Sequence, residues 1–238
     1  LIDTYSHEAV VDLIREEMGK VRLIASTATE PISLESIVLA VEKTANTRWQ
    51  SHFLPVINAT GVILHTNLGR APLSHASLDA VRQTSATYSN LEYDIDSGER
   101  GSRYAHIMSL LKHLTGAEDA LAVNNNAAAV LLTMTALAQD KEVILSRAEA
   151  VEIGGGFRIP DVMKQSGAHL VEVGTTNRTY VRDFEEAITL NTAALLRVHS
   201  SNFKIIGFTH SVELADMANL AQRRGVALLD DLGSGSLI

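Results

Sequence analysis

Residues 122–131 read Ala-Val-Asn-Asn-Asn-Ala-Ala-Ala-Val-Leu, the pattern of a short apolar strand, a polar turn and the first turn of a helix. A helix start leaves backbone N–H groups unpaired and carries a partial positive charge, which together favour phosphate binding. Small alanines let an anion approach the backbone, and Asn tolerates unusual backbone angles. The candidate phosphate cradle comprises Asn124, Asn125, Asn126, Ala127 and Ala128. The alternative is an Asn N-cap before a buried helix.

From residue 121 onwards, short apolar runs alternate with helical patterns. The expected strands are 121–123, 142–145, 169–173, 193–198 and 226–229, and the expected helices are 127–138, 159–165, 183–189 and 212–223. Strands that alternate with helices predict a mostly parallel sheet with helices on both faces and right-handed connections. The predicted fold class is therefore α/β.

Polar residues follow each of the five expected strands. Ligands of open α/β sheets bind outside the carboxyl ends of the strands, so these exits predict a ligand site at one edge. Asp231 follows the apolar run 226–229, and a carboxylate in such a position is costly unless it is paired. It either caps the next turn or meets a cation, of which the pyridinium nitrogen of pyridoxal phosphate is one example.

The first half of the chain has a different pattern. A helix is expected over 6–24, and Ser33 is the expected N-cap of a second helix that ends near Trp49. Their expected apolar faces consist of Val10, Val11, Ile14, Met18 and Val21, and of Leu34, Ile37, Val38 and Val41. Further on, Ser74 is expected to cap a helix, and Gly116 to end another one after a charged, glycine-punctuated loop over 90–104. The two N-terminal helices suggest a small module outside the main fold.

Composition excludes several classes of protein and site. The 238 residues contain no cysteine, so disulfides, thiolate metal sites and cysteine nucleophiles are excluded, and a cytoplasmic protein is favoured. The net charge of −8 shows no strongly basic nucleic-acid face, and no apolar run approaches membrane-spanning length. The common nucleotide and zinc-protease motifs are missing, and His106 and His113 are too far apart along one helix for a metal pair. We expect no metal site and no membrane association.

A set of contiguous motifs carries a family resemblance. They are 56–61 (VINATG), 64–70 (LHTNLGR), 90–94 (NLEYD), 116–120 (GAEDA), 123–132 (VNNNAAAVLL), 151–155 (VEIGG), 157–163 (FRIPDVM), 173–178 (VGTTNR) and 231–237 (DLGSGSL). On these motifs the chain resembles the bacterial selenocysteine synthases, the L-seryl-tRNA(Sec) selenium transferases. The resemblance covers nearly the whole chain.

The resemblance implies a fold-type I pyridoxal-phosphate architecture, with a large domain preceded by a small helical N-terminal domain. Enzymes of this family convert the seryl group of seryl-tRNA(Sec) into a selenocysteinyl group through an aminoacrylyl intermediate, with selenophosphate as the selenium donor. They assemble as homo-oligomeric rings of dimers, and the N-terminal domain helps to recognise the tRNA. The domains implied here are 1–52 as the helical module, 53–70 as a linker or entry segment and 71–238 as the pyridoxal-phosphate-binding domain.

The family pattern also implies roles for single residues. The cradle from Asn124 to Ala128 would hold the cofactor phosphate, and Asp231 would pair with the pyridine nitrogen. Three residues after the fourth expected strand would contact the cofactor ring: His199, Ser201 and Asn202. Arg100 and Arg103 lie in the loop that the family uses near the substrate, and arginine suits the anionic selenophosphate because the guanidinium fork matches phosphate oxygens. The alternative for these arginines is a solvated charged surface.

The family's Schiff-base lysine belongs to a Gly-Asp-Lys motif downstream of Gly-Ser-Gly-Ser, and that motif is not among the 238 residues. We therefore expect the chain to be part of a longer enzyme, and to be inactive by itself. Two other functions stay open at this point. One is a related lyase that acts on a small phosphorylated amino compound with the same cofactor. The other is a truncated, non-catalytic paralogue that assembles or binds RNA.

Overall fold

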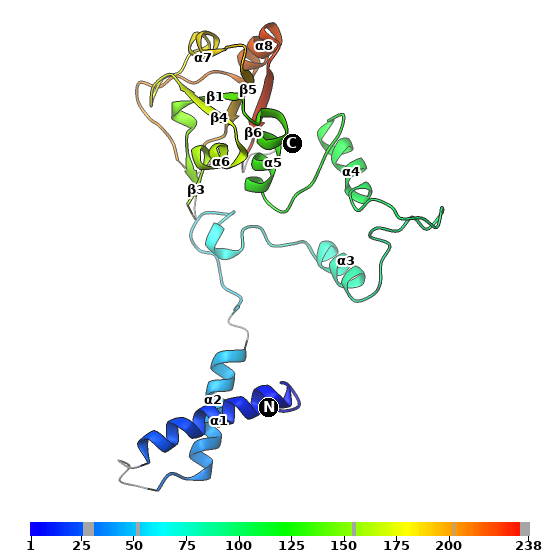
Figure 1. The fold of residues 1–238 in the computed structure, drawn as a ribbon, viewed down its shortest axis with the longest axis vertical. Coiled ribbons are helices and arrows are strands. Elements are labelled where there is room, and N and C mark those ends of the chain that lie inside the picture. The colour runs from blue at the N-terminus through cyan, green and yellow to red at the C-terminus, as the bar shows by residue number, and fades with distance from the viewer. Residues whose placement is uncertain (26–30, 51–52, 154–155, 202, 234–238) are drawn as a thin grey trace. The chain divides into compact units, whose positions relative to one another are not determined.

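The computed structural model describes residues 1–25, 31–50, 53–153, 156–201 and 203–233. It divides the chain into two compact units, residues 1–72 and residues 73–238 (Figure 1). No helix in the described part combines the length and the apolarity needed to cross a lipid bilayer.

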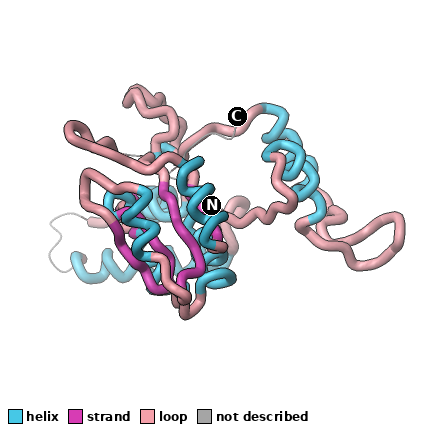
Figure 2. Tube along the Cα trace, turned by 90° about the horizontal axis from the view of Figure 1, so that it is seen from above, coloured by secondary structure: helices cyan, strands magenta, loops and turns pink. Residues whose placement is uncertain are grey.

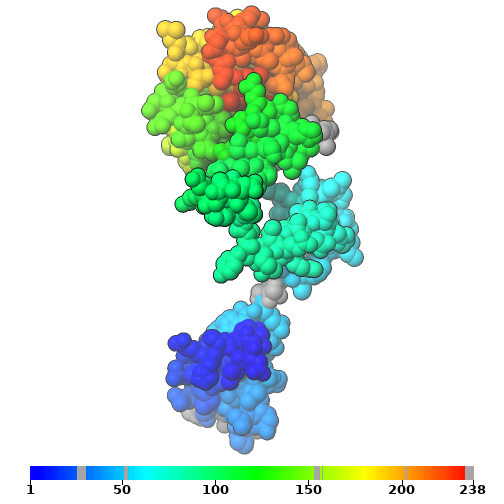
Figure 3. All heavy atoms as spheres, turned by 90° about the vertical axis from the view of Figure 1, so that its right-hand side faces the viewer, coloured from blue at the N-terminus to red at the C-terminus, as the bar shows by residue number. Residues whose placement is uncertain are grey.

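The N-terminal unit contains two helices, α1 (His7–Ile24) and α2 (Leu34–Trp49). Each begins after a serine N-cap, of which Ser33 was predicted: the Oγ of Ser6 accepts from the N–H of residue 9 at 3.3 Å, and the Oγ of Ser33 accepts from that of residue 36 at 3.2 Å. The atoms of α1 (dark blue) lie against those of α2 (lighter blue) in Figure 3. Both helices were therefore correctly predicted from local signals.

The buried faces of these helices differ from the prediction. The seam consists of Leu13, Val41 and Ala45, whereas Ile14 and Val38 are exposed. Each helix packs against one other helix, so only a narrow stripe of its apolar side chains is buried. The predicted apolar faces were wider than this stripe and were therefore wrong in part. Glu17 enters the seam instead, and its carboxylate accepts from Lys20 Nζ at 2.6 Å and from Thr44 Oγ1 at 3.0 Å.

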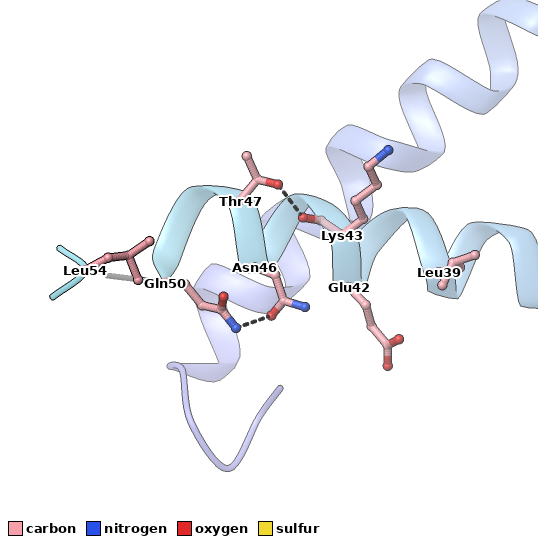
Figure 4. Close-up of a pocket in the computed structure, with 7 residues that line it drawn as sticks. All are labelled: Leu39, Glu42, Lys43, Asn46, Thr47, Gln50 and Leu54. Atoms are coloured by element: carbon pink, nitrogen blue, oxygen red, sulfur yellow. Dashed lines mark hydrogen bonds between the residues drawn. The ribbon is translucent and has the colours of Figure 1, made fainter. Parts of the chain in front are cut away.

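A hollow of about 680 Å³ lies along α2 in this unit. Figure 4 shows that Asn46 and Gln50 point to the same side of the helix, where Gln50 Nε2 donates to Asn46 Oδ1 at 3.2 Å. The hollow is lined by Leu39, Glu42, Lys43, Asn46, Thr47, Gln50 and Leu54. After α2, the described residues of this unit form one 3₁₀ turn, Thr66–Leu68.

The second unit is built on a four-stranded sheet. Its strands are β1 (Glu142–Ser146), β4 (His169–Val173), β5 (Thr192–Val198) and β6 (Ala227–Asp231). Their order is β4-β1-β5-β6, and each neighbouring pair is parallel. The predicted parallel sheet is confirmed, with strand bounds within two residues of those expected.

Helices cover both faces of this sheet, as Figure 2 shows from above. They are α5 (Asn126–Ala138), α6 (Ile159–Ser166), α7 (Val181–Ala187) and α8 (Leu214–Arg224). Val143 and Leu145 of β1 pack with α5 and α6, whereas Ile144 packs with α7 and α8. Successive residues of a strand point to opposite faces, so both faces of β1 are apolar because both are covered.

The remaining elements lie before and between these. They are α3 (His75–Ser85), α4 (Ala105–Thr115), the 3₁₀ turn Arg147–Glu149 and the two-stranded hairpin β2 (Glu152–Ile153) with β3 (Phe157–Arg158). Ser74 caps α3 and Gly116 ends α4 in the left-handed conformation, both as predicted. The sequence did not predict the hairpin, whose strands are only two residues long.

The structure corrects the prediction of a strand over residues 121–123. These residues make no strand pairing in the described structure, and Leu121 and Val123 are exposed. A strand needs a neighbour whose backbone groups complete its hydrogen bonds, and a three-residue apolar run does not reveal whether that neighbour exists. The segment instead leads directly into α5.

The turn after β4 gives a stability prediction. Gly174 has a φ of 70°, and a Cβ there would lie 2.8 Å from the Cβ of Thr179 and 2.9 Å from the carbonyl oxygen of Arg178. We expect Gly174→Ala to lower the free energy of unfolding by about 2–4 kcal/mol, from backbone strain and overpacking together. The matched control is Gly167→Ala, where φ is 82° but the nearest atom is a flexible Gln139 carbon at 3.4 Å. Denaturant midpoints of the full-length variants would test this, and equal losses would contradict it.

Candidate active site

The four parallel strands end at one edge of the sheet, and polar residues follow each of them. Ser146 at the end of β1 is in register with Val173 of β4, and Val198 of β5 is in register with Asp231 of β6. The predicted gathering of polar strand exits at one edge is therefore present for these four strands. The fifth exit, residues 124–126, follows a segment that is not a strand.

The start of α5 provides backbone donors beside this edge. Asn125 is the N-cap, and its Oδ1 accepts from the N–H of Ala128 at 2.8 Å. The backbone N–H groups of Asn126 and Ala127 make no hydrogen bond with the described residues. Asn124 is exposed and Ala127 is half-buried. The Asn N-cap is thus present in the structure, and phosphate binding by the cradle stays a prediction.

Asp231 joins β6 to the cradle. Its side chain is 9% exposed, and Oδ1 accepts from Asn126 Nδ2 at 2.8 Å and from the backbone N–H of Gly233 at 3.0 Å. The second bond shows that Asp231 caps the following turn, which was one of the two roles open to it. The bond to Asn126 places a buried carboxylate beside the first turn of α5.

His199 and Ser201 lie close to the chain segment that carries Asp231 and Gly233. The backbone N–H of His199 donates to the carbonyl oxygen of Asp231 at 2.9 Å. A Cβ at Gly233 would lie 2.7 Å from Ser201 Oγ, which shows how closely the two chain segments approach. The structure therefore brings His199, Ser201, Asp231 and Asn126 together. Asn202 and residues 234–238 of the last motif lie outside the described residues.

Arg100 and Arg103 lie elsewhere, in the loop between α3 and α4. Both guanidinium groups bind the carboxylate of Glu92. Among the described residues, no hydrogen bond or ion pair joins either arginine to the cradle or to Asp231. A role of these arginines near the substrate therefore stays a prediction.

Glu149 is a site residue to which the sequence assigned no role. It follows β1, and its Oε2 accepts from the backbone N–H of Val198 at 3.0 Å. Burial raises the pKa of Glu149 to about 7, against the lowering effects of that hydrogen bond and of Arg197. The only sequence signal was its place in a strand exit, because its hydrogen-bond partner lies 49 residues away.

Glu149 lines a cavity of about 180 Å³ at this edge. The other polar residues that line it are Ser146, Asn177, Thr179, Ser200, Thr209, His210 and Ser211. Ser146 Oγ and Thr179 Oγ1 are 2.7 Å apart and buried, and His210 Nδ1 lies 2.8 Å from the carbonyl oxygen of Thr179. The cavity is thus polar and largely satisfied by internal hydrogen bonds.

Cradle and carboxylate together fit a particular kind of ligand. N–H groups that make no hydrogen bond with the described residues, at the start of a 13-residue helix, suit an anionic phosphate. A buried carboxylate whose Oδ1 accepts, among the described residues, from two neutral donors suits a nearby cation. The residues present therefore fit a group that carries a phosphate at one end and a protonated ring nitrogen at the other, as pyridoxal phosphate does.

Comparison with known proteins identifies the family. The sequence model of the family described as L-seryl-tRNA selenium transferase matches residues 56–238. The chain belongs to this family. The match covers the cradle, Asp231, the loop that holds Arg100 and Arg103, and the whole parallel sheet, so the resemblance inferred from the sequence motifs is confirmed.

Two relatives show how far the similarity to the selenium transferases extends. The L-seryl-tRNA(Sec) selenium transferase of Carboxydothermus hydrogenoformans is 49% identical over 243 residues, which cover the whole chain and 51% of that protein. The protein of the same name from Clostridium perfringens is 60% identical over 183 residues, which cover 77% of the chain and 40% of that protein. The chain spans about half the length of the curated relatives it matches.

A solved structure supports the fold of this chain. D-Glucosaminate-6-phosphate ammonia-lyase matches with a TM-score of 0.56 and 22% identity, over 69% of this chain and 45% of that one. At this identity the likeness concerns the fold alone. Together with the parallel sheet, it confirms the predicted α/β class, the large-domain fold of the fold-type I pyridoxal-phosphate enzymes.

Glu149 gives a prediction about pH and stability. A carboxyl whose pKa is raised from 4.5 to about 7 on folding favours the protonated form. Its contribution to the free energy of unfolding is therefore full below pH 4.5 and is lost as the pH rises towards 7. Above pH 7 the ionised group costs about 3 kcal/mol. Glu149→Gln keeps an acceptor for the Val198 N–H without a charge, so we expect it to stabilise the full-length protein at pH 8 and not at pH 4.5.

Urea unfolding of the full-length protein across pH 4.5–8 would measure this. The matched control is Glu152→Gln, which changes an exposed carboxylate paired with Arg158. Parallel stability curves for wild type and Glu149→Gln would contradict the prediction.

Proposed function

We propose that the full-length enzyme to which this chain belongs converts L-seryl-tRNA(Sec) into L-selenocysteinyl-tRNA(Sec), with selenophosphate as the selenium donor and pyridoxal 5'-phosphate as the cofactor. Family membership and relatives of 49–60% identity named as this transferase support the reaction. The observation that carries the cofactor assignment is the Asn126–Asp231 hydrogen bond, which sets a buried carboxylate beside a helix start whose first N–H groups make no hydrogen bond with the described residues.

Each residue of the candidate site has a proposed role. The N–H groups at the cradle, Asn124 to Ala128, would hold the cofactor phosphate, and Asp231 would pair with the ring nitrogen. When bound, the cofactor would supply an electron sink for the loss of the serine α-proton and hydroxyl. His199, Ser201 and Asn202 are the proposed ring contacts. The lysine that binds the cofactor covalently is proposed to lie outside the 238 residues.

Asn126 has a positioning role in this proposal. Its amide Nδ2 donates to Asp231 Oδ1, while the Gly233 N–H donates to the same oxygen. Two donors on one carboxylate oxygen fix the rotation of the side chain. A carboxylate held in a fixed orientation is what a protonated ring nitrogen requires. The small side chains of Ala127 and Ala128 leave the helix start open to an anion.

The proposed partners involve other parts of the chain. Arg100 and Arg103 are proposed to receive the anionic selenophosphate, since guanidinium groups match phosphate oxygens. The helical module, residues 1–52, is proposed to help recognise the tRNA. Arg22 and Lys43 support this, because they form no ion pair among the described residues, whereas Arg15, Lys20 and Arg48 are paired with carboxylates. We also propose that residues 53–70 link this module to the large domain, 71–238.

The proposal extends to the whole protein. A cytoplasmic homo-oligomer, a ring of dimers as the family resemblance implies, would bring residues of different subunits to one site. Such an arrangement would allow Arg100 and Arg103 to serve a cradle that they do not contact within their own chain.

The cofactor assignment predicts a difference between two adjacent aspartates. We expect the full-length protein to show an absorbance band in the visible that borohydride removes. Asp231→Asn should weaken cofactor affinity about tenfold or more, because it removes a charge-assisted contact to the ring nitrogen. Asp230→Asn is the matched control, since Asp230 pairs with Arg197 at 3.2 Å on the neighbouring strand. Equal cofactor affinity of the two variants, from absorbance titration, would contradict the assignment.

The reaction itself has a direct test. Purified full-length protein, given seryl-tRNA(Sec) and selenophosphate, should form selenocysteinyl-tRNA(Sec), detected by acid-gel electrophoresis after transfer of ⁷⁵Se to the aminoacyl group. Arg103→Gln should reduce turnover at low selenophosphate and less at saturation. Elimination of ammonia from a small phosphorylated amino compound without this transfer would instead favour the lyase. No bound cofactor and no turnover would favour the non-catalytic paralogue.

A further inference from the structure

The loop between α3 and α4 is closed by its own backbone. Tyr93 and Arg100 form an isolated antiparallel bridge, and the N–H of Gly101 donates to the carbonyl oxygen of Glu92 at 3.0 Å. The N–H of Asp94 donates to the carbonyl oxygen of Glu99 at 2.9 Å, and Gly98 takes a φ of 72° at the turn. The backbone of Glu92 is therefore fixed opposite the chain segment that carries Arg100.

Both oxygens of the Glu92 carboxylate bind an arginine. Arg100 Nη2 donates to Oε2 at 2.8 Å, and Arg103 Nε donates to Oε1 at 2.7 Å, with a second bond from Arg103 Nη2 to the same oxygen. His106 Nε2 lies 3.1 Å from the carbonyl oxygen of Leu91, so the first turn of α4 is also tied to this loop. One carboxylate thus gathers two guanidinium groups that lie three residues apart.

The two guanidinium groups remain accessible to solvent. The side chains of Arg100 and Arg103 are 82% and 59% exposed, whereas that of Glu92 is 27% exposed. Hydrogen bonds from Arg103 lower the pKa of Glu92, with a smaller effect of Arg100, so the carboxylate is ionised at neutral pH. An anion that approaches from solvent would meet two cations whose donors are already directed at a neighbouring carboxylate.

We propose that Glu92 is a positioning residue that holds Arg100 and Arg103 together as one receptor for the anionic selenium donor and is displaced from them when the donor binds. This inference rests on the proposed function, which assigns the donor to these arginines. In the absence of the donor, Glu92 supplies the acceptor oxygens. A phosphate-like group has three strong acceptor oxygens and a charge of about −2, so it competes well against a single carboxylate for two guanidinium groups.

Two roles of Glu92 can be distinguished by experiment. In an exchange, the donor displaces Glu92 from the two arginines, whereas in a purely structural role Glu92 only stabilises the loop. If Glu92 competes with the donor, removing its charge while keeping its shape should strengthen anion binding. Glu92→Gln retains one acceptor oxygen for an arginine, so the side chains stay gathered, but no negative charge opposes the anion. If Glu92 only stabilises the loop, the same change should weaken anion binding and lower the melting temperature together.

The experiment uses the full-length holoenzyme, whose cofactor site is filled, and inorganic phosphate as the probe. Isothermal titration at constant ionic strength should give a dissociation constant about fivefold lower for Glu92→Gln than for wild type, as expected for loss of one like charge a few ångströms from the anion. Glu99→Gln is the matched control, because it removes a charge from the same loop at a residue without an ion pair among the described residues. The control should change the constant less than twofold.

A double variant separates the inference from the function on which it rests. Arg100→Gln with Arg103→Gln should weaken phosphate binding at least tenfold if the arginines are the anion site. Loss of binding in this variant, without tighter binding in Glu92→Gln, would overturn the exchange and leave the anion site intact. Unchanged binding in the double variant would overturn the proposed anion site and the exchange with it. The KM for selenophosphate should fall in Glu92→Gln, and kcat should not rise.

Discussion

The structure of the second unit depends on the burial of both faces of one parallel sheet. Val143, Ile144 and Leu145 alternate between the two faces, and each face is covered by a pair of helices. Crossover helices join the parallel strands, so all four strands run in the same direction and their carboxyl ends lie at one edge of the sheet. The polar residues that follow the strands gather at this edge for that reason alone, whether or not they contact one another.

At that edge, one short series of hydrogen bonds links the strand exits. Glu149 accepts from Val198 N–H, the next residue His199 donates to the carbonyl oxygen of Asp231, and Asp231 accepts from Asn126. The exits of β1, β5 and β6 and the start of α5 are thus joined in series. Glu149, whose pKa burial raises to about 7, lies at one end of the series, and Asp231, whose Oδ1 accepts from two donors, lies at the other. The two acids of this edge therefore have different environments.

Charge is distributed unevenly between the parts of the chain. In the N-terminal unit, Glu16 and Glu17 form ion pairs with Lys20 and Arg48, whereas Arg22 and Lys43 form no ion pair among the described residues. In the loop before α4, the carboxylate of Glu92 forms ion pairs with both arginines. A net charge of −8 therefore does not exclude local sites for polyanions. What matters is which cations are held by internal carboxylates and how readily an external anion can replace them.

The sequence by itself determined the elements whose signals are local. The starts of α1, α2 and α3 follow from serines that cap N–H groups three residues away, and the strands from two-sided apolar runs with polar exits. Only the tertiary structure decided what depends on distant partners. Residues 121–123 are not a strand because no described strand pairs with them, and the carboxylate of Glu149 accepts from a backbone group 49 residues away. Asp231 likewise meets Asn126 across 105 residues, and Arg100 and Arg103 both bind Glu92, one of the four acidic residues of their loop. Hydrogen bonds within one turn depend on residues that are close in the sequence and can be predicted from it. Burial and long-range pairing depend instead on how the helices pack on the sheet.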